Sequence, residues 1–296
     1  MSAATEKTHS YVNVRLSEQA FRRLAWWTVG WLILIIATGA TVRLTGSGLG
    51  CHHWPGCTPH AFLPEQGFHS DVEFGNRVVA AFTVFATLVL AVASLVARHA
   101  RALSWTVFVG TLAQAPLGAI TIHYGLNPYL VIAHLLLSLF VLGLCVVVAV
   151  RGHGFALPVR ARQLASLLLA AVTFLVVTGT LATASGKFPG SNAGTPVRRI
   201  GMFQPAVALH VKAVAIFGVS FLLLAFWAFR NRVKWLLAAG GGLLAILVGQ
   251  MVVGEFQYRM YGTIPWWVVL IHVALAASLF AWTVGLAARV WYPARN

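Results

Sequence analysis

Long apolar stretches recur along this chain and restrict its fold more than any other feature. They lie near residues 24–42, 78–97, 102–122, 129–150, 163–186, 203–229, 235–254 and 260–288, and almost all of them lack charged residues. Each approaches or exceeds the length of about 20 residues that a helix needs to cross a membrane. The chain is 59% hydrophobic and 9% charged, whereas soluble domains carry roughly 25% charged residues. We therefore predict an all-α membrane protein with eight transmembrane helices in a lipid bilayer.

The charges of the chain, which sum to +15, predict its orientation. If the N-terminus is cytoplasmic, most of the 21 lysines and arginines lie on the cytoplasmic side, as the positive-inside rule requires. This pattern predicts a bacterial plasma membrane protein with both termini in the cytoplasm, and no nucleic-acid partner is needed to explain the basic composition. The remaining cations lie near the outer face: Arg43, Arg77, Lys187, Arg198, Arg199, Lys212 and Arg259. They leave room for an anionic ligand there, although ordinary loop charge explains any one of them as well.

An internal repeat organises the chain. The order Gln, Gly, Tyr, Pro, His occurs twice, as Gln114, Gly118, Tyr124, Pro128 and His134, and as Gln250, Gly254, Tyr258, Pro265 and His272. A Thr-Gly pair also lies near the end of the first and the fifth apolar run. Because each copy holds an even number of spans, both copies insert in the same direction, which makes this a parallel repeat. We predict a cytoplasmic segment over 1–23, a four-helix half over 24–150, a cytoplasmic linker over 151–162 and a second four-helix half over 163–296.

Three histidines lie inside apolar runs: His134, His210 and His272. A titratable side chain at such depth in a membrane is costly and marks a functional site. Each lies near the start of a span that runs inward, so the three share one level, and matching the second and sixth spans puts Asn76 opposite His210. Two histidines that face each other across a helical bundle can hold a haem iron, and outer cations would contact its propionates. A single buried histidine is more often a packing residue or part of a proton relay.

Glu73 lies three residues before Asn76, on the same face of the second span. A carboxylate at the apolar boundary can accept a proton, and the second copy has Val207 at this position. We therefore predict a chemical role for Glu73, with an ion pair to Arg77 or Arg43 as the alternative.

The cysteines fall into two classes. Cys51 and Cys57 lie in the first outer loop, on the oxidising side of the membrane, which favours a disulfide over two free thiols. Cys145 lies within the fourth span, where we expect it to pack in the core.

These residues resemble the haem A synthase family over nearly the whole chain. The resemblance is carried by residues 38–51 with the following Trp54-Pro55, by the Glu73-x-x-Asn76-Arg77 box, and by the three histidine helices. It implies a pseudo-twofold bundle of eight helices. It also implies an enzyme whose N-terminal half binds haem o and oxidises its C8 methyl to a formyl group, giving haem a.

The resemblance further implies roles for individual residues. His210 and His272 would ligate a haem b cofactor, His134 would ligate the substrate haem, and Cys51 and Cys57 can pair. Glu73, Asn76 and Arg77 form the predicted catalytic group. The family has histidine where this chain has Asn76, and some relatives carry a second cysteine pair that is absent between the fifth and sixth spans here. The sequence leaves open whether Asn76 ligates iron, forms a hydrogen bond or leaves an axial position free.

Other interpretations of the sequence remain. The candidates for propionate contacts are Arg43 and Arg77 in the first half and Arg198, Arg199 and Lys212 in the second. A b-type cytochrome that only transfers electrons would explain His210 and His272 but not Glu73, and a haem carrier would hold haem without altering it. A haem o synthase, a terminal oxidase under assembly and a second copy of the chain are partners that the sequence neither requires nor excludes.

Overall fold

The fold is described by a computed structural model that covers residues 16–51, 53–54, 56–64, 67–191 and 197–292. The described residues form helices α1 (Glu18–Leu44), α2 (Phe68–Ala97), α3 (Arg101–Leu112), α4 (Gln114–His123), α5 (Pro128–Val150), α6 (Val159–Ser185), α7 (Phe203–Arg230), α8 (Lys234–Arg259) and α9 (Trp266–Trp291). α3 and α4 together form one span, so the structure has eight helical segments that are long and apolar enough to cross a membrane. The prediction of an all-α membrane protein with eight spans is confirmed.

The helix ends follow local sequence signals. Ser17 caps α1, because its side chain accepts a hydrogen bond from the backbone N–H of Ala20. Asn127 caps α5 in the same way, with Pro128 at the first helical position. α1 begins within the predicted N-terminal segment, of which residues 1–15 lie outside the described residues. α6 likewise begins within the predicted linker, at Val159.

The third span was predicted as one helix but is broken between Leu112 and Gln114. Pro116 lies just beyond the break. Proline has no backbone N–H, and its ring clashes with the carbonyl four residues earlier, here that of Leu112. The break therefore has a local cause, and it falls next to Gln114, one of the repeated residues.

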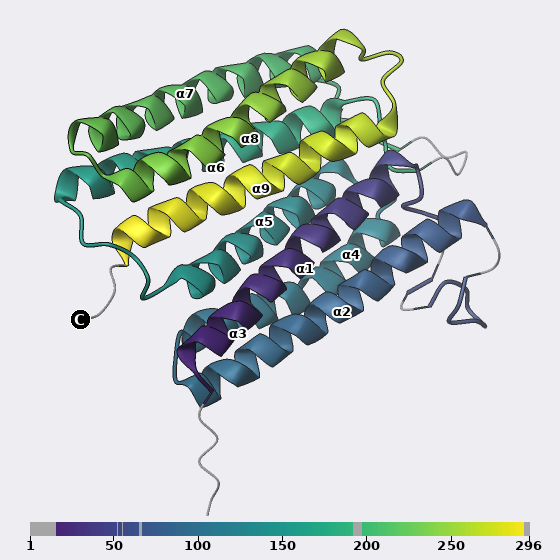
Figure 1. The fold of residues 1–296 in the computed structure, drawn as a ribbon. Coiled ribbons are helices and arrows are strands. Elements are labelled where there is room, and N and C mark those ends of the chain that lie inside the picture. Colours follow the sequence, from purple (N-terminus) through teal and green to yellow (C-terminus); the bar gives the residue numbers. More distant parts are fainter. Residues whose placement is uncertain (1–15, 52, 55, 65–66, 192–196, 293–296) are drawn as a thin grey trace, which may run out of the picture.

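The helices pack as two groups of four spans (Figure 1). In the first group α1 contacts α2, α2 contacts α3, and α3 and α4 contact α5, which returns to α1. In the second group α6, α7, α8 and α9 contact one another in the same cyclic order. The groups meet where α9 packs on α1 and α5, and where α5 packs on α6. Cys145 lies in this core, fully buried, as predicted.

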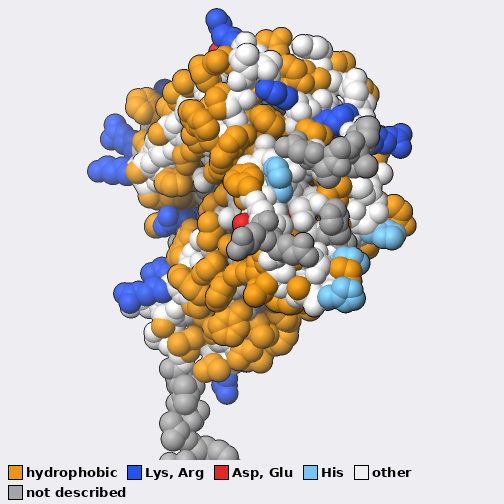
Figure 2. All heavy atoms as spheres, turned by 90° about the vertical axis from the view of Figure 1, so that its right-hand side faces the viewer, with side chains coloured by type: hydrophobic (Ala, Val, Ile, Leu, Met, Phe, Trp, Pro, Cys, Tyr) orange, Lys and Arg blue, Asp and Glu red, His pale blue; other side chains and the backbone are white. Residues whose placement is uncertain are grey.

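The loops between spans connect the groups at one end, on the right of Figure 1. The backbone N–H of Gly48 donates to the carbonyl oxygen of Gly190 at 2.7 Å, beside a single bridge between Ser47 and Ser191. A methyl group on Gly48 would lie 2.8 Å from that carbonyl oxygen, so only glycine allows the two loops to approach. Figure 2 views this end, where histidine side chains are more visible than carboxylates.

Candidate functional site

His210 and His272 face each other across the interior of the second group. His210 lies on α7 and His272 on α9, helices that lie diagonally in the bundle without a close backbone contact among the described residues. The centroids of the two imidazole rings are 6.5 Å apart, and the ring planes form an angle of 74°. Both residues lie roughly 10 Å from the start of their helices, at about 1.5 Å per residue. The rings therefore flank one space at one depth.

Each of the three histidine rings is partly buried and lies against a glycine on a neighbouring helix. Methyl groups placed on Gly179 and Gly254 would lie 3.1 Å from Cε1 of His210 and 3.2 Å from Cε1 of His272, respectively. In the first group, a methyl group on Gly118 would lie 3.5 Å from Cε1 of His134. The absence of a side chain at these positions allows each ring to lie against helix backbone, which fixes the direction in which the ring points.

The Thr-Gly pairs of the predicted repeat make matching contacts. The hydroxyl oxygen of Thr178 lies 3.2 Å from Nδ1 of His210, within hydrogen-bonding distance. In the first group, the hydroxyl of Thr38 donates to Oδ1 of Asn76 at 2.7 Å, and Gly39 follows as Gly179 follows Thr178. The equivalence of Asn76 and His210 that was inferred from sequence is thus supported by the same partner from the preceding helix.

The repeated glutamines also make matching contacts. Gln250 donates through Nε2 to the carbonyl oxygen of His272 at 3.0 Å, and Gln114 donates to that of His134 at 3.4 Å and to Oγ of Ser138 at 2.9 Å. Among the described residues, Oε1 of both glutamines and Nδ1 of His134 and His272 are buried without a hydrogen-bond partner. Each buried polar atom left unpaired lowers the stability of the fold by about 1–3 kcal/mol. A polar or metal-containing ligand that paired with these atoms would remove that cost.

Glu73 lies in the second turn of α2 and is only 4% exposed. Its Oε1 accepts from Nη2 of Arg77 at 2.6 Å, and its Oε2 accepts from the backbone N–H of Cys51 at 2.8 Å. Both carboxylate oxygens are thus engaged, and the ion pair with Arg77 that we gave as an alternative is present. A chemical role for Glu73 stays a proposal.

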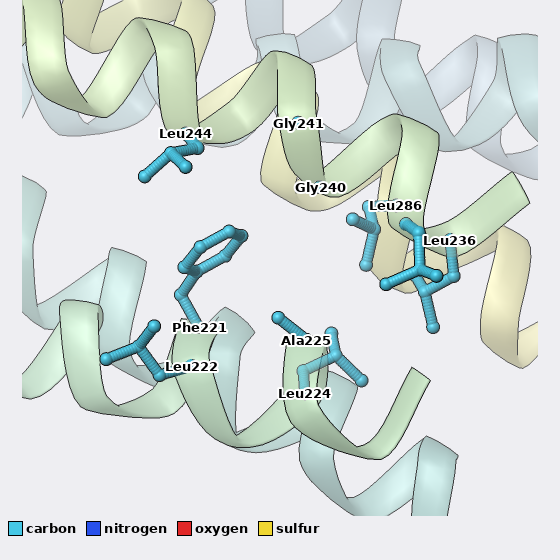
Figure 3. A pocket seen from close by; sticks show the side chains of 10 residues that line it. Phe221, Leu222, Leu224, Ala225, Leu236, Gly240, Gly241, Leu244 and Leu286 are labelled. Atoms are coloured by element: carbon cyan, nitrogen blue, oxygen red, sulfur yellow. The ribbon is translucent and has the colours of Figure 1, made fainter. Parts of the chain in front are cut away.

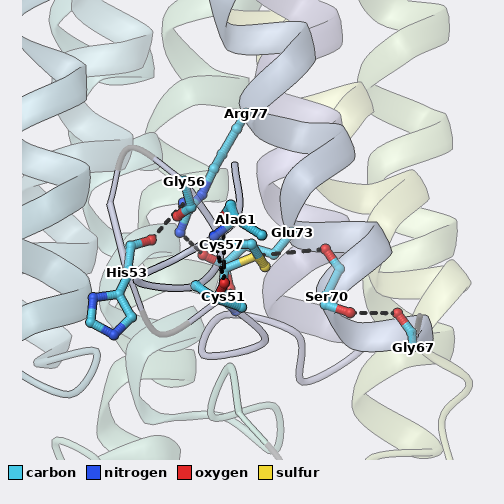
Figure 4. The surroundings of a disulfide bond; sticks show 10 residues. Cys51, His53, Gly56, Cys57, Ala61, Gly67, Ser70, Glu73 and Arg77 are labelled. Atoms are coloured by element: carbon cyan, nitrogen blue, oxygen red, sulfur yellow. Dashed lines mark hydrogen bonds and ion pairs between the residues drawn. A yellow bond between two sulfur atoms is a disulfide. The ribbon is translucent and has the colours of Figure 1, made fainter. Parts of the chain in front are cut away.

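The disulfide between Cys51 and Cys57 is present, as predicted. Arg77 reaches into the small loop that it closes, where Nη1 donates to the carbonyl oxygens of His53 at 2.8 Å and Gly56 at 2.6 Å (Figure 4). Arg77 therefore joins Glu73 to the backbone of the disulfide loop. The guanidinium that we predicted to contact a haem propionate is hydrogen-bonded to protein groups instead.

Arg43 and Arg199 lie together at the end of α6, although they were predicted to serve different halves. Arg43 donates to the carbonyl oxygens of Thr183 at 2.9 Å and Phe188 at 3.3 Å. Arg199 donates to the same two oxygens, at 3.3 Å and 2.7 Å. Burial lowers the pKa of the Arg199 guanidinium, and the nearby Tyr261 opposes this shift. The other two candidates, Arg198 and Lys212, are exposed.

Some contacts of these sites were not inferred from sequence. We assigned no role to Gln114 and Gln250, although a spacing of four residues puts each on the same helix face as the glycine that contacts the histidine ring. The arginines also bind backbone carbonyl oxygens, namely those of His53, Gly56, Thr183 and Phe188. Backbone groups leave no pattern in the side chains, so these contacts could not be predicted from the sequence.

Comparisons with known proteins find similarity over part of the chain. Residues 22–71, which include most of α1 and the disulfide loop, match the family model COX15-CtaA, the cytochrome oxidase assembly proteins. The protein named Heme A synthase of Geobacillus kaustophilus is 35% identical over 107 residues, which is 34% of this chain and 33% of that protein. Its counterpart in Bacillus pumilus is 33% identical over 126 residues, 40% of this chain and 41% of that protein.

A shorter match has a different name. A protein of Thermus thermophilus named Protoheme IX farnesyltransferase is 34% identical over 67 residues, 22% of this chain and 11% of that protein. The chain spans about a third of the length of the first relatives that it matches. Over the matched residues the chain is similar to proteins named Heme A synthase, and its eight long apolar helices are those of a multi-pass membrane protein.

Proposed function

We propose that this protein is a haem A synthase, an oxidoreductase that converts the C8 methyl group of haem o to a formyl group through successive hydroxylations. The observation that carries the proposal is a difference between equivalent positions of two similar sites. The second group presents the histidine pair His210 and His272. The first presents His134 and Asn76, with the buried carboxylate of Glu73 one turn away. The second site is suited to hold a cofactor, and the first is suited to bind the substrate and carry out the reaction.

The second site fits a haem b held by two histidines. Two metal–nitrogen bonds of about 2 Å each, with the ring centroids about 1 Å behind the ligating nitrogens, require a centroid separation of about 6 Å. The observed separation is 6.5 Å. The contact with Thr178 orients the His210 ring through Nδ1 and leaves Nε2 for the metal, a common arrangement for metal-binding histidines. When bound, haem b would relay electrons.

The first site is proposed to bind haem o through His134 alone. Gly118 holds the His134 ring from one side, and Gln114 binds the backbone carbonyl of the same residue. Oδ1 of Asn76 is already bound by Thr38, so its amide nitrogen is the atom left to face the substrate. A neutral amide is a weaker iron ligand than imidazole, so His134 would hold the substrate haem more strongly than Asn76 would.

Glu73 is proposed to accept a proton from the substrate at the edge of the first site, and Arg77 is proposed to hold the Glu73 carboxylate in place. The carboxylate is fixed in position by a guanidinium and by a backbone N–H, and a carboxylate so placed can accept a proton when the substrate loses one. Arg43 and Arg199 use two of the five N–H groups of each guanidinium. The remaining donors make them our candidates for propionate contacts between the two sites.

The orientation and the partners are parts of the same proposal. We place both termini in the cytoplasm of a bacterial plasma membrane, because the lysines and arginines favour the end at which α1 begins and α9 ends. Haem o is the proposed substrate, and a haem o synthase is the class of enzyme that would supply it.

The identity of bound haem tests this function. The protein would be purified from a host that supplies haem o but has no haem A synthase, and its haem would be extracted and analysed. Haem a or a hydroxymethyl intermediate beside haem b is the expected result. Haem b alone would contradict the proposal in favour of an electron-transfer cytochrome, and unaltered haem o beside haem b would point to a carrier.

A further inference from the structure

An apolar groove lies between α7 and α8, far along these helices from the histidine pair. It encloses about 310 Å³ and is lined by side chains of α7, α8 and α9 (Figure 3). Its floor is formed by buried residues, among them Phe221, Leu224, Leu236 and Leu286. Its rim carries Leu222, which is 63% exposed, and Leu244, which is 46% exposed. The groove is therefore open on the side of the molecule that faces membrane lipid.

A run of three glycines hollows the α8 wall of this groove. Gly242 is packed against α9, because a methyl group there would lie 2.5 Å from the Trp282 ring. Gly240 and Gly241 line the groove, and a methyl group on Gly241 would meet no atom within 4 Å. Close packing on one face of α8 is thus combined with open space on the other. A side chain could be accommodated at Gly241, and its absence keeps the space free.

Three cations lie at the end of the groove, in the turn that joins α7 to α8. Arg230, Arg232 and Lys234 are all exposed, and Lys234 precedes the lining residue Leu236 by two positions. The sequence has no aspartate or glutamate from Phe203 to Gly254, so neither helix carries an acidic side chain near them. The turn lies at the same end of the molecule as the start of α1 and the end of α9 (Figure 1).

We propose that the α7–α8 groove binds one anionic phospholipid. An acyl chain would fill the groove between Phe221 and Gly241, and the phosphate group would contact the turn cations. Basic residues beside a gap between membrane helices attract anionic headgroups, and an acyl chain in the groove would gain van der Waals contacts with its apolar lining. The site is separate from the histidine pair and does not depend on the reaction proposed above.

Lipid binding to the full-length purified protein tests the proposal. The protein would be stripped of lipid in detergent and titrated by native mass spectrometry with phosphatidylglycerol and with phosphatidylcholine that carries the same acyl chains. The double variant Arg232→Asn and Lys234→Gln removes two exposed charges. It should weaken phosphatidylglycerol binding about 25-fold, at roughly fivefold for each cation near the headgroup, and leave phosphatidylcholine binding unchanged.

Two further variants separate the parts of the site. Gly241→Leu fills the groove and should weaken the binding of both lipids, while the turn cations stay in place. Arg98→Asn with Arg101→Gln removes two exposed cations from the α2–α3 turn and serves as the matched control, since Arg98 and Arg232 have φ angles of 53° and 54°. It should change neither affinity.

Several results would overturn the proposal. Equal affinity of the native protein for the two lipids would show that the headgroup charge is not recognised. Equal losses in the α2–α3 and α7–α8 charge variants would show a general surface effect. Unchanged binding in Gly241→Leu would show that no chain occupies the groove.

Discussion

The two groups of helices build similar sites and complete them differently. In both, a Thr-Gly pair contacts one residue of the next helix, and a Gln-x-x-x-Gly helix supports a histidine of the last. The contacted residue is Asn76 in the first group and His210 in the second. One exchanged side chain thus changes a site with two imidazoles into a site with one, while its supports are retained.

The outer ends of the two sites differ more than their interiors. In the first group a disulfide loop, Arg77 and Glu73 form a buried polar cluster next to Asn76. The second group has Val207 where the first has Glu73. We propose that the repeated interior binds a flat ligand, and that the added charge at one end directs chemistry to the first site.

The largest expected effect comes from removal of the carboxylate that only the first group has. Glu73→Ala should lower the yield of haem A by about a hundredfold or more, as expected for loss of a proton acceptor. Because Arg77 would lose its carboxylate partner but keep its hydrogen bonds to His53 and Gly56, the variant should also lose about 1.5–3 kcal/mol of stability. Haem extraction and thermal unfolding measure the two effects.

Glu73→Gln separates these effects, since it retains the shape and removes the charge. It should remain folded and still lose haem A. Val207→Ala at the equivalent position of the second group is the control and should retain activity. A Glu73→Gln protein with native haem A yield would remove the proposed difference between the two outer ends.

Opening the disulfide loop is expected to act through Glu73. The double variant Cys51→Ser and Cys57→Ser loosens the loop whose backbone N–H binds Oε2 of Glu73. Loss of that charge-assisted hydrogen bond, worth about 1.5 kcal/mol, corresponds to about a tenfold fall in haem A yield. The haem b content, which we assign to the second group, should not change. A parallel fall in haem b would show that the loop supports the whole fold rather than one site.

Asn76→His makes the two sites alike and should have a smaller effect. The hydroxyl of Thr38 would contact the new ring as Thr178 contacts His210. We expect the haem A yield to stay within about fivefold of native, because His134 and Glu73 are retained and a change below about 1 kcal/mol is less than about fivefold. Absorption spectra of the protein loaded with haem o should shift toward those of a haem with two histidine ligands. An inactive but folded variant would show that an open axial position is required.

The smallest effects on haem A yield are expected from the glycines behind the rings. Gly179→Ala and Gly254→Ala place a methyl group 3.1 Å and 3.2 Å from a histidine ring, whereas Gly118→Ala places it at 3.5 Å, an ordinary contact. Overpacking of this kind costs about 1 kcal/mol or more, so the first two variants should shift the haem b absorption and lower its midpoint of thermal release. Gly118→Ala should leave both unchanged, and equal shifts in all three would contradict the geometry.

Much of the fold could be predicted from the sequence because membrane helices are recognisable by the length of their apolar runs. The predicted second span began near residue 78, whereas α2 begins at Phe68, since Asp71, Glu73 and Arg77 interrupt the apolar run without interrupting the helix. The predicted last span began near residue 260, but α9 begins at Trp266, after Pro265.

The histidines could be found because a polar side chain inside an apolar run is conspicuous, and the repeat supplied the equivalence of Asn76 and His210. The partners of Glu73 could not be chosen in advance. Arg77, Arg43 and the loop backbone were all within reach along the chain, and only the path of the loop after Cys51 decides among them. The division into a substrate half and a cofactor half stays a prediction.

The most direct test compares His134→Ala with His272→Ala in the same haem o-supplying host. Each purified protein would be analysed for haem b and for haem a with its hydroxymethyl intermediate. If the two sites have separate roles, His134→Ala keeps haem b and loses the oxidised products, whereas His272→Ala loses haem b. Loss of the same haem in the same proportion from both variants would contradict the assignment of one site to the cofactor and the other to the substrate.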